Sequence, residues 1–180
     1  TSVLPLDDTQ AFEDLMAERG DQVAAVIIEP IPANNGLLLQ RVEFLQALRK
    51  TTQRHGTLLI FDEVITGFRL ALGGAQERFG ISADIVTYGK TLGGGLPIGV
   101  LSGTPEVLSY ITTDHDGEKL PVFNGGTFSA NPLTVAAGMA VVRYLSETRE
   151  ETYARLERDG ETVRAALNDF CRSEGVPAHV

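Results

Sequence analysis

Thr57–Thr66, TLLIFDEVIT, is the stretch that decides the fold of this 180-residue chain. Its first five residues are a short apolar run, which predicts a strand buried on both faces. Asp62 and Glu63 end the run. A carboxylate at the mouth of a buried strand is costly to desolvate unless a cationic group meets it, so we expect Asp62 to have such a partner.

A second run, residues 83–88 (ADIVTY), leads through Gly89 to Lys90. If the two strands are neighbours, their ends present an anion and an amine to one crevice, where ligands bind in open α/β sheets. Two solvated loop charges are the commoner arrangement for an arbitrary Asp/Lys pair. Here, however, the glycine-rich segment 93–99 follows Lys90, and its backbone freedom indicates a loop shaped around a ligand.

Apolar periodicity and turn residues divide the rest of the chain into alternating helices and strands. Further strands are expected over 23–28 and 98–101. Helices are expected over 9–19, 42–54, 105–111, 132–146 and 150–173, with a short helix within the loop 66–80. Strands that alternate with helices imply parallel pairing through right-handed crossovers, and therefore an α/β fold.

Composition excludes several classes of protein. The net charge of −9 and the lack of a basic stripe argue against a nucleic-acid partner. The apolar runs are too short to span a membrane, and the first residues do not resemble a signal peptide. One cysteine, Cys171, allows no intramolecular disulfide and suits a reducing cytoplasm. The segment 112–119 (TTDHDGEK) has the wrong spacing for a calcium loop, so we expect no metal site.

Three kinds of chemistry compete for Lys90. A phosphate-binding P-loop requires a glycine where this chain has Asp84, and a dinucleotide fingerprint requires one where it has Ile98. The third possibility is a covalent amine, because a lysine in a partly desolvated pocket can form a Schiff base with a carbonyl compound. A carboxylate against a pyridinium nitrogen keeps such a ring an electron sink, and Asp62 could fill that place.

These residues and their order resemble the class III pyridoxal-phosphate aminotransferases of fold type I. The resemblance runs from Val23 to about Gly138, through AAVIIEP, LLIFDEVITGFR, ADIVTYGKTLGGGLPIG and GTFSANPL. It implies a three-layer αβα large domain with a mostly parallel sheet. It also implies pyridoxal 5'-phosphate as cofactor.

By position in these motifs, the resemblance makes Lys90 the Schiff-base lysine, which also moves the proton between the cofactor carbon and the substrate carbon. It makes Asp62 the partner of the pyridinium nitrogen. Val64 would pack against a face of the cofactor ring, although an ordinary core valine is an equally good interpretation.

The resemblance implies further cofactor contacts on other loops. Glu29 would line the pocket, and Asn34 would place its amide against the phenolic oxygen, with Asn35 as an alternative register. Gly126 and Thr127 match the position that reaches the phosphate of a neighbouring subunit. The resemblance therefore implies a homodimer with shared active sites.

The loop after Gly67 narrows the resemblance. Many members continue with Gly-Arg-Thr-Gly, whereas residues 68–76 here read FRLALGGAQ. This resembles the glutamate-1-semialdehyde 2,1-aminomutase branch and related aminotransferase domains of natural-product pathways. The resemblance implies transfer of an amino group from an amine donor to an aldehyde or ketone acceptor. Intramolecular amino transfer is the alternative.

Complete members of the family are more than twice as long as this chain. We therefore expect residues 1–146 to be the later part of the large domain. Residues 147–180 would be a linking helix and the start of a small C-terminal domain. Missing would be the earlier Ser/Gly-rich phosphate loop, the aromatic residue that stacks on the ring, and the elements that bind the substrate carboxylate. A catalytically silent fragment or dimerisation segment thus remains a further alternative.

Overall fold

The computed structural model describes residues 1–111, 122 and 125–180, so the segment 112–119 with its Asp-x-Asp-Gly pattern lies outside the described residues. The chain divides into two compact units, Thr1–Val142 and Arg143–Val180. Within the described part, no helix is both long and apolar enough to cross a membrane.

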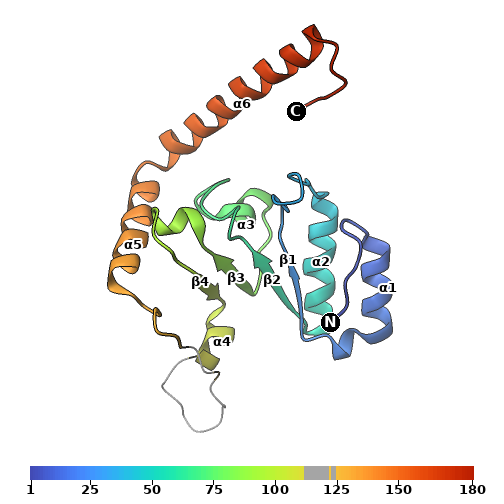
Figure 1. The fold of residues 1–180 in the computed structure, drawn as a ribbon. Coiled ribbons are helices and arrows are strands. Elements are labelled where there is room, and N and C mark those ends of the chain that lie inside the picture. Colours follow the sequence, from blue (N-terminus) through green and yellow to red (C-terminus); the bar gives the residue numbers. More distant parts are fainter. Residues whose placement is uncertain (112–121, 123–124) are drawn as a thin grey trace. The chain divides into compact units, whose positions relative to one another are not determined.

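The first unit is built on a four-stranded sheet of order β1-β2-β3-β4, shown in Figure 1. The strands are β1 (Ala25–Ile28), β2 (Leu58–Asp62), β3 (Ile85–Tyr88) and β4 (Val100–Gly103). β1, β2 and β3 are parallel, which confirms the mostly parallel α/β fold. β4 runs antiparallel to β3, so parallel pairing was the wrong expectation for this strand. The loop between β3 and β4 is too short for the crossover that a parallel neighbour needs.

The described helices lie where periodicity predicted them. They are α1 (Thr9–Arg19), α2 (Val42–His55), α3 (Gly74–Phe79), α4 (Pro105–Leu108), α5 (Pro132–Glu147) and α6 (Arg149–Ser173). Three short 3-10 helices accompany them, over Gly20–Gln22, Lys90–Gly93 and Ser109–Ile111. Asp8 caps α1 by accepting a hydrogen bond from the Ala11 amide. Gly56 ends α2 in the left-handed conformation, which glycine adopts without steric cost.

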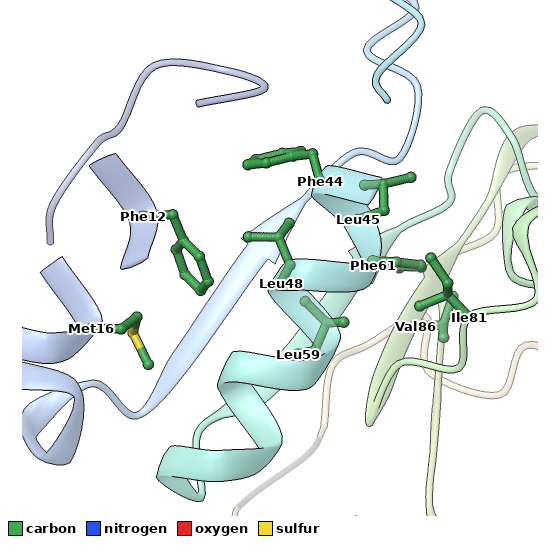
Figure 2. Packing of buried hydrophobic residues seen from close by; sticks show 9 residues of the cluster. All are labelled: Phe12, Met16, Phe44, Leu45, Leu48, Leu59, Phe61, Ile81 and Val86. Carbon is green, nitrogen blue, oxygen red and sulfur yellow. The ribbon is translucent and has the colours of Figure 1, made fainter. Parts of the chain in front are cut away.

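The main core lies between one face of the sheet and the helices α1 and α2. Figure 2 shows the side chains of these helices around Leu59 and Phe61, both of which are fully buried. Side chains alternate along a strand, so Ile60 and Asp62 point to the opposite face and are half-buried. On that face Ile27, the β1 partner of Ile60, is 66% exposed. The expectation that both faces of this strand are buried is therefore wrong for the described structure.

Asp84 fixes the position of β2 against α2 and the start of β3. Its Oδ2 accepts a 2.7 Å hydrogen bond from the Leu59 amide and forms a 3.0 Å ion pair with Nη1 of Arg49. The bond is to the second residue of β2, three residues before Asp62. The contacts that stabilise the core therefore also fix the position of β2, and with it the position of the Asp62 carboxylate at its end.

Replacing Leu59 by alanine should lower the free energy of unfolding by about 2–5 kcal/mol, because the cavity would open in the centre of this core. Leu39→Ala is the control, since Leu39 is 80% exposed, and it should change stability by less than about 0.5 kcal/mol. Urea unfolding followed by circular dichroism measures both. Equal losses in the two variants would contradict the assigned core.

Candidate functional site

Asp62 is held at the carboxyl end of β2 by two neutral donors. Its Oδ1 accepts hydrogen bonds from Oγ1 of Thr87, at 3.0 Å, and from the amide of Val64, at 3.1 Å. Asp62 and Thr87 are register partners across the parallel β2–β3 pair. Within the described residues Asp62 forms no ion pair, so the cationic partner expected from the sequence is not one of these side chains.

Lys90 lies just beyond the end of β3, at the same edge of the sheet as Asp62. It follows Thr87 by three residues and begins the 3-10 helix Lys90–Gly93. Its φ of +43° is in the left-handed region, which costs a residue with a Cβ on the order of 1–3 kcal/mol. Its side chain is exposed. Lys90 therefore has a strained backbone conformation, and it presents an accessible amine at the edge of the sheet that also carries Asp62.

Val64 packs against the backbone that leads to Lys90. A Cβ added at Gly89 would lie 3.4 Å from Cγ1 of Val64 and 3.2 Å from the carbonyl oxygen of Ile98. A side chain at this position would press on the Ile98 carbonyl, whereas its distance to Val64 is an ordinary van der Waals contact. Asp62, Val64 and Lys90, three of the residues singled out in the sequence, therefore lie at the same edge of the sheet.

The other predicted residues are placed less closely. Glu29 directly follows β1, whose Ile28 pairs with Phe61, so it is level with Asp62 at the same edge. Asn34 is exposed in a turn, and Gly126 and Thr127 are exposed before α5. Among the described residues no hydrogen bond joins Asn34 or Thr127 to Asp62 or Lys90. Glu29 is therefore placed at this edge, whereas Asn34 and Thr127 have no described hydrogen bond to it.

Glu63 is a buried carboxylate that the sequence reasoning did not single out. Its side chain is fully buried and accepts hydrogen bonds from Oγ1 of Thr66 at 3.1 Å, the Ala75 amide at 2.5 Å and the Gln76 amide at 3.2 Å. Burial raises the pKa of this carboxyl, and the three hydrogen bonds partly offset that rise.

Tyr88 lies next to this carboxylate, and its phenol has a raised pKa. Burial is the main cause, and the charge of Glu63 adds to it, while a hydrogen bond with Gln76 acts in the opposite direction. The Tyr88 ring contacts the Phe68 ring with centroids 5.3 Å apart. The phenol therefore stays neutral at physiological pH and serves as part of the packing beneath the loop.

Two other contacts near Lys90 were missed in the sequence. Thr87 could have been found from the predicted strand, since it is a polar residue three positions before Lys90. Arg69 donates from Nη2 to Oγ1 of Thr91 at 3.1 Å and so ties the loop after β2 to the turn after Lys90. No local pattern marks that pair, because it joins segments 22 residues apart.

A groove of ≈ 840 Å³ lies elsewhere in the first unit. It follows β1 and is lined by the first six residues of the chain and by side chains such as Phe12, Phe44 and Leu48. Neither Asp62 nor Lys90 lines it. Within the described residues no group of three or more His, Cys, Asp or Glu side chains is arranged to hold a metal ion.

Comparison with known families decides the relationship. The model of the family "Aminotransferase class-III" matches residues 5–180. This chain belongs to the class III aminotransferases. Pyridoxal 5'-phosphate is the cofactor of this family, and a solved structure described as a transaminase with PLP bound has a TM-score of 0.87 and 29% identity to this chain.

Curated relatives share a name that differs from that of the family. Glutamate-1-semialdehyde 2,1-aminomutase of Thermomicrobium roseum is 43% identical over 180 residues, and that of Pyrobaculum aerophilum is 49% identical over 173 residues. These matches include 100% and 93% of this chain. The chain spans 40% of the length of each relative.

Solved structures confirm the fold and include transaminases. An omega-transaminase from Sphaerobacter thermophilus has a TM-score of 0.89 and 40% identity, over 99% of this chain and 39% of that one. A β-phenylalanine aminotransferase from Variovorax paradoxus has a TM-score of 0.82 and 35% identity, over 97% and 39%. The chain therefore has relatives of both names.

The described residues fit the pyridine ring of the cofactor. Both hydrogen bonds to Asp62 end on Oδ1, so among the described residues Oδ2 carries none and can accept a bond from a protonated ring nitrogen. Asp62 is half-buried and stands on the less covered face of the sheet, where a ring can reach it. An exposed amine and a valine side chain lie at the same edge.

The raised pKa of Glu63 predicts a pH dependence of stability. The folded protein binds this proton more tightly than the unfolded chain, whose carboxyl titrates near the ordinary value of 4.5. The stabilising contribution is therefore complete below that pH and is lost as pH rises through the folded-state pKa. Glu63→Gln removes the titrating group and should remove this decline.

Urea unfolding of the wild type and of Glu63→Gln, from pH 4.5 upward, measures the effect as the difference between the two proteins at each pH. Glu77→Gln is the matched control, because Glu77 is an exposed carboxylate of α3, the helix whose amides Glu63 binds, and its Oε2 accepts from the Gly73 amide at 2.8 Å. A difference between wild type and Glu63→Gln that is constant with pH would contradict the raised pKa.

Proposed function

We propose that Lys90 is the amine that bonds the aldehyde of pyridoxal 5'-phosphate, and that the protein transfers an amino group from an amine donor to an aldehyde or ketone acceptor. The donor becomes a carbonyl compound and the acceptor becomes an amine. The observation that carries this proposal is the shared sheet edge at which an accessible Lys90 meets Asp62 with its Oδ2 free of described partners.

The cofactor, when bound, supplies an electron sink for the bonds broken at the amino-bearing carbon. The side chains of the protein hold the cofactor ring and move the proton. Oδ2 of Asp62 holds the proton on the ring nitrogen, because a nearby carboxylate stabilises the charged form of that nitrogen. Val64 limits the tilt of the ring from one face. Nζ of Lys90 takes a proton from the substrate carbon and returns it to the cofactor carbon.

The remaining predicted contacts belong to the same proposal. Glu29 would line the pocket beside Asp62, and Asn34 would meet the phenolic oxygen after a change in its exposed turn. Gly126 and Thr127 would reach the phosphate held by the second subunit of a homodimer. Both residues are exposed in the described structure, which supports this role.

The domain organisation and surroundings follow from the family. Residues 1–146 would be the later part of the cofactor-binding large domain, and 147–180 the linking helix and the start of the small domain. The division of the chain into compact units within α5 supports this. The net charge of −9 and the single cysteine support a cytoplasmic enzyme of small molecules with no nucleic-acid partner.

Intramolecular amino transfer is the second candidate. It is favoured by the name of the curated relatives, glutamate-1-semialdehyde 2,1-aminomutase, at 43% and 49% identity. The segment Gly73–Gln76, which suggested this branch, begins α3 and contacts Glu63 beside Asp62. A difference in this segment could therefore alter the neighbourhood of the reacting groups.

A silent scaffold or dimerisation segment is the third candidate, because the chain spans 40% of the curated relatives it matches. Equilibrium dialysis with pyridoxal phosphate separates it from the enzyme proposals. Stoichiometric binding that is lost in Lys90→Ala would exclude a silent role.

Pyridoxal phosphate added to the protein should produce visible absorbance, and borohydride should fix the cofactor on the peptide that contains Lys90. Lys90→Ala should lose the label and at least 10²–10⁴-fold in amino-transfer rate, because the proton carrier is gone. Lys50→Ala is the control, since Lys50 is an exposed lysine of α2, and it should retain both. A cofactor fixed on another lysine would contradict the assignment.

An isotope experiment distinguishes the two enzyme candidates. An aminoaldehyde substrate carrying ¹⁵N is incubated with the loaded protein and an unlabelled external amine. Transamination should consume the external amine and give a diamine that keeps its ¹⁵N and gains an unlabelled nitrogen at the former aldehyde carbon. Isomerised product that keeps its own ¹⁵N would replace the first candidate by the aminomutase.

A further inference from the structure

Glu63 has no direct access to the face on which Asp62 lies. Asp62 is the last residue of β2, and Glu63 continues the ladder by donating its amide to the carbonyl of Thr87 at 3.0 Å. Adjacent side chains on an extended backbone point to opposite faces. Asp62 is half-buried, whereas Glu63 is fully buried and bonded to α3. Any part that Glu63 plays at the site must therefore act through the residues it holds.

The carboxylate of Glu63 joins the two ends of the loop that follows β2. Oε2 accepts from Oγ1 of Thr66 at the start of the loop and from the Ala75 amide at its end, while Oε1 accepts from the Gln76 amide. These donors account for both oxygens, so the buried group is satisfied and rigid. The loop is closed by one side chain.

The approach of the loop to this carboxylate requires glycine. Gly74 has φ +65°, and a Cβ built there would lie 2.1 Å from Oε2 of Glu63. A larger residue would have to push the carboxylate away from the Ala75 and Gln76 amides. Both the positive φ of Gly74 and its close approach to Glu63 therefore require glycine at this position.

The backbone of Glu63 connects this closure to Asp62. The Glu63 amide donates to the carbonyl of Thr87 at 3.0 Å, and the Glu63 carbonyl accepts from the Gly67 amide at 2.8 Å. The turn that results aims the next amide, that of Val64, at Oδ1 of Asp62. The same turn places the Val64 side chain against Gly89, beside Lys90. If this turn opens, the Val64 amide leaves Asp62 and the Val64 side chain leaves Gly89.

We propose that Glu63 is a positioning residue for the cofactor site: its buried carboxylate fixes the turn that keeps the Val64 amide on Oδ1 of Asp62 and leaves Oδ2 aimed at the ring nitrogen. This assignment rests on the proposed function for its link to the cofactor. Its geometric part, from Glu63 to the Val64 amide, stands without any cofactor.

Hydrogen–deuterium exchange tests the geometric part on the protein without cofactor. Individual amides are resolved by electron-transfer fragmentation in the wild type, Glu63→Gln and the matched control Glu77→Gln. We expect Val64 to exchange on the order of tenfold faster in Glu63→Gln and unchanged in Glu77→Gln, because opening of the turn becomes easier. Faster exchange at Ala75 and Gln76 with Val64 still protected shows a merely structural role and overturns the proposal.

Absorbance of the bound cofactor tests the functional part. The pH midpoint of its visible band should move in Glu63→Gln in the direction found for Asp62→Asn, and by less, while Glu77→Gln keeps the wild-type midpoint. An unmoved midpoint in Glu63→Gln, with cofactor bound, overturns the positioning role. Absence of cofactor from the wild type itself refutes the proposed function instead, and the Val64 exchange rate then decides the positioning role alone.

Thr66→Val provides a second variant in case Glu63→Gln does not fold. It removes one donor to Oε2 and leaves the carboxylate and the two backbone donors in place. The proposal expects a smaller change of the same sign at Val64 and in the absorbance midpoint. Val64 exchange and a midpoint identical to those of the wild type would count against the proposal.

Discussion

The parallel pairing of β2 with β3 is the constraint on which the site depends. It places Thr87 opposite Asp62 and Lys90 two residues beyond the end of the neighbouring strand. A register shift of one residue would turn Asp62 toward the α1 and α2 face and bring Glu63 to the other. Burial of Leu59 and Phe61 opposes such a shift, because it would expose both. Core packing therefore selects which carboxylate is accessible.

The loops at this edge are held by contacts that require unusual backbone conformations. Lys90 has a positive φ, and so does Phe68, whose ring packs on Tyr88. Such conformations persist when the surroundings determine them from several sides. Here Arg69 reaches Thr91 from the loop after β2, so the two loops support each other. The edge is thus a set of turns that support one another at the ends of β2 and β3.

Local patterns were sufficient to predict the helices and the parallel part of the sheet. They also predicted that Asp62 and the Lys90 loop follow the ends of neighbouring strands. They failed where distant residues decide. The direction of β4 depends on the length of its connection, and the burial of β2 depends on which helices cover each face. Glu63 was overlooked because a carboxylate beside Asp62 looks like a second exposed charge. Its role becomes visible when α3, more than ten residues later, turns its amides toward it. Asn34 and Thr127 were assigned to the site by resemblance alone, and no described hydrogen bond of these residues supports or contradicts that assignment.

Asp62 and Glu63 show how one dipeptide supplies two different carboxylates. Asp62 accepts bonds on one oxygen and keeps the other without described partners, so it retains the capacity to meet a charged ring. Glu63 has its bonds spread over both oxygens and lies out of contact with solvent, so it has no such capacity. The difference follows from strand alternation, which sends one side chain to the accessible face and the other to the core. A buried carboxylate with a raised pKa is costly to keep. Glu63 lies next to Asp62, and its carboxylate bonds reach both ends of the loop that follows. This is why we assign Glu63 to the site and not to the buried interior alone.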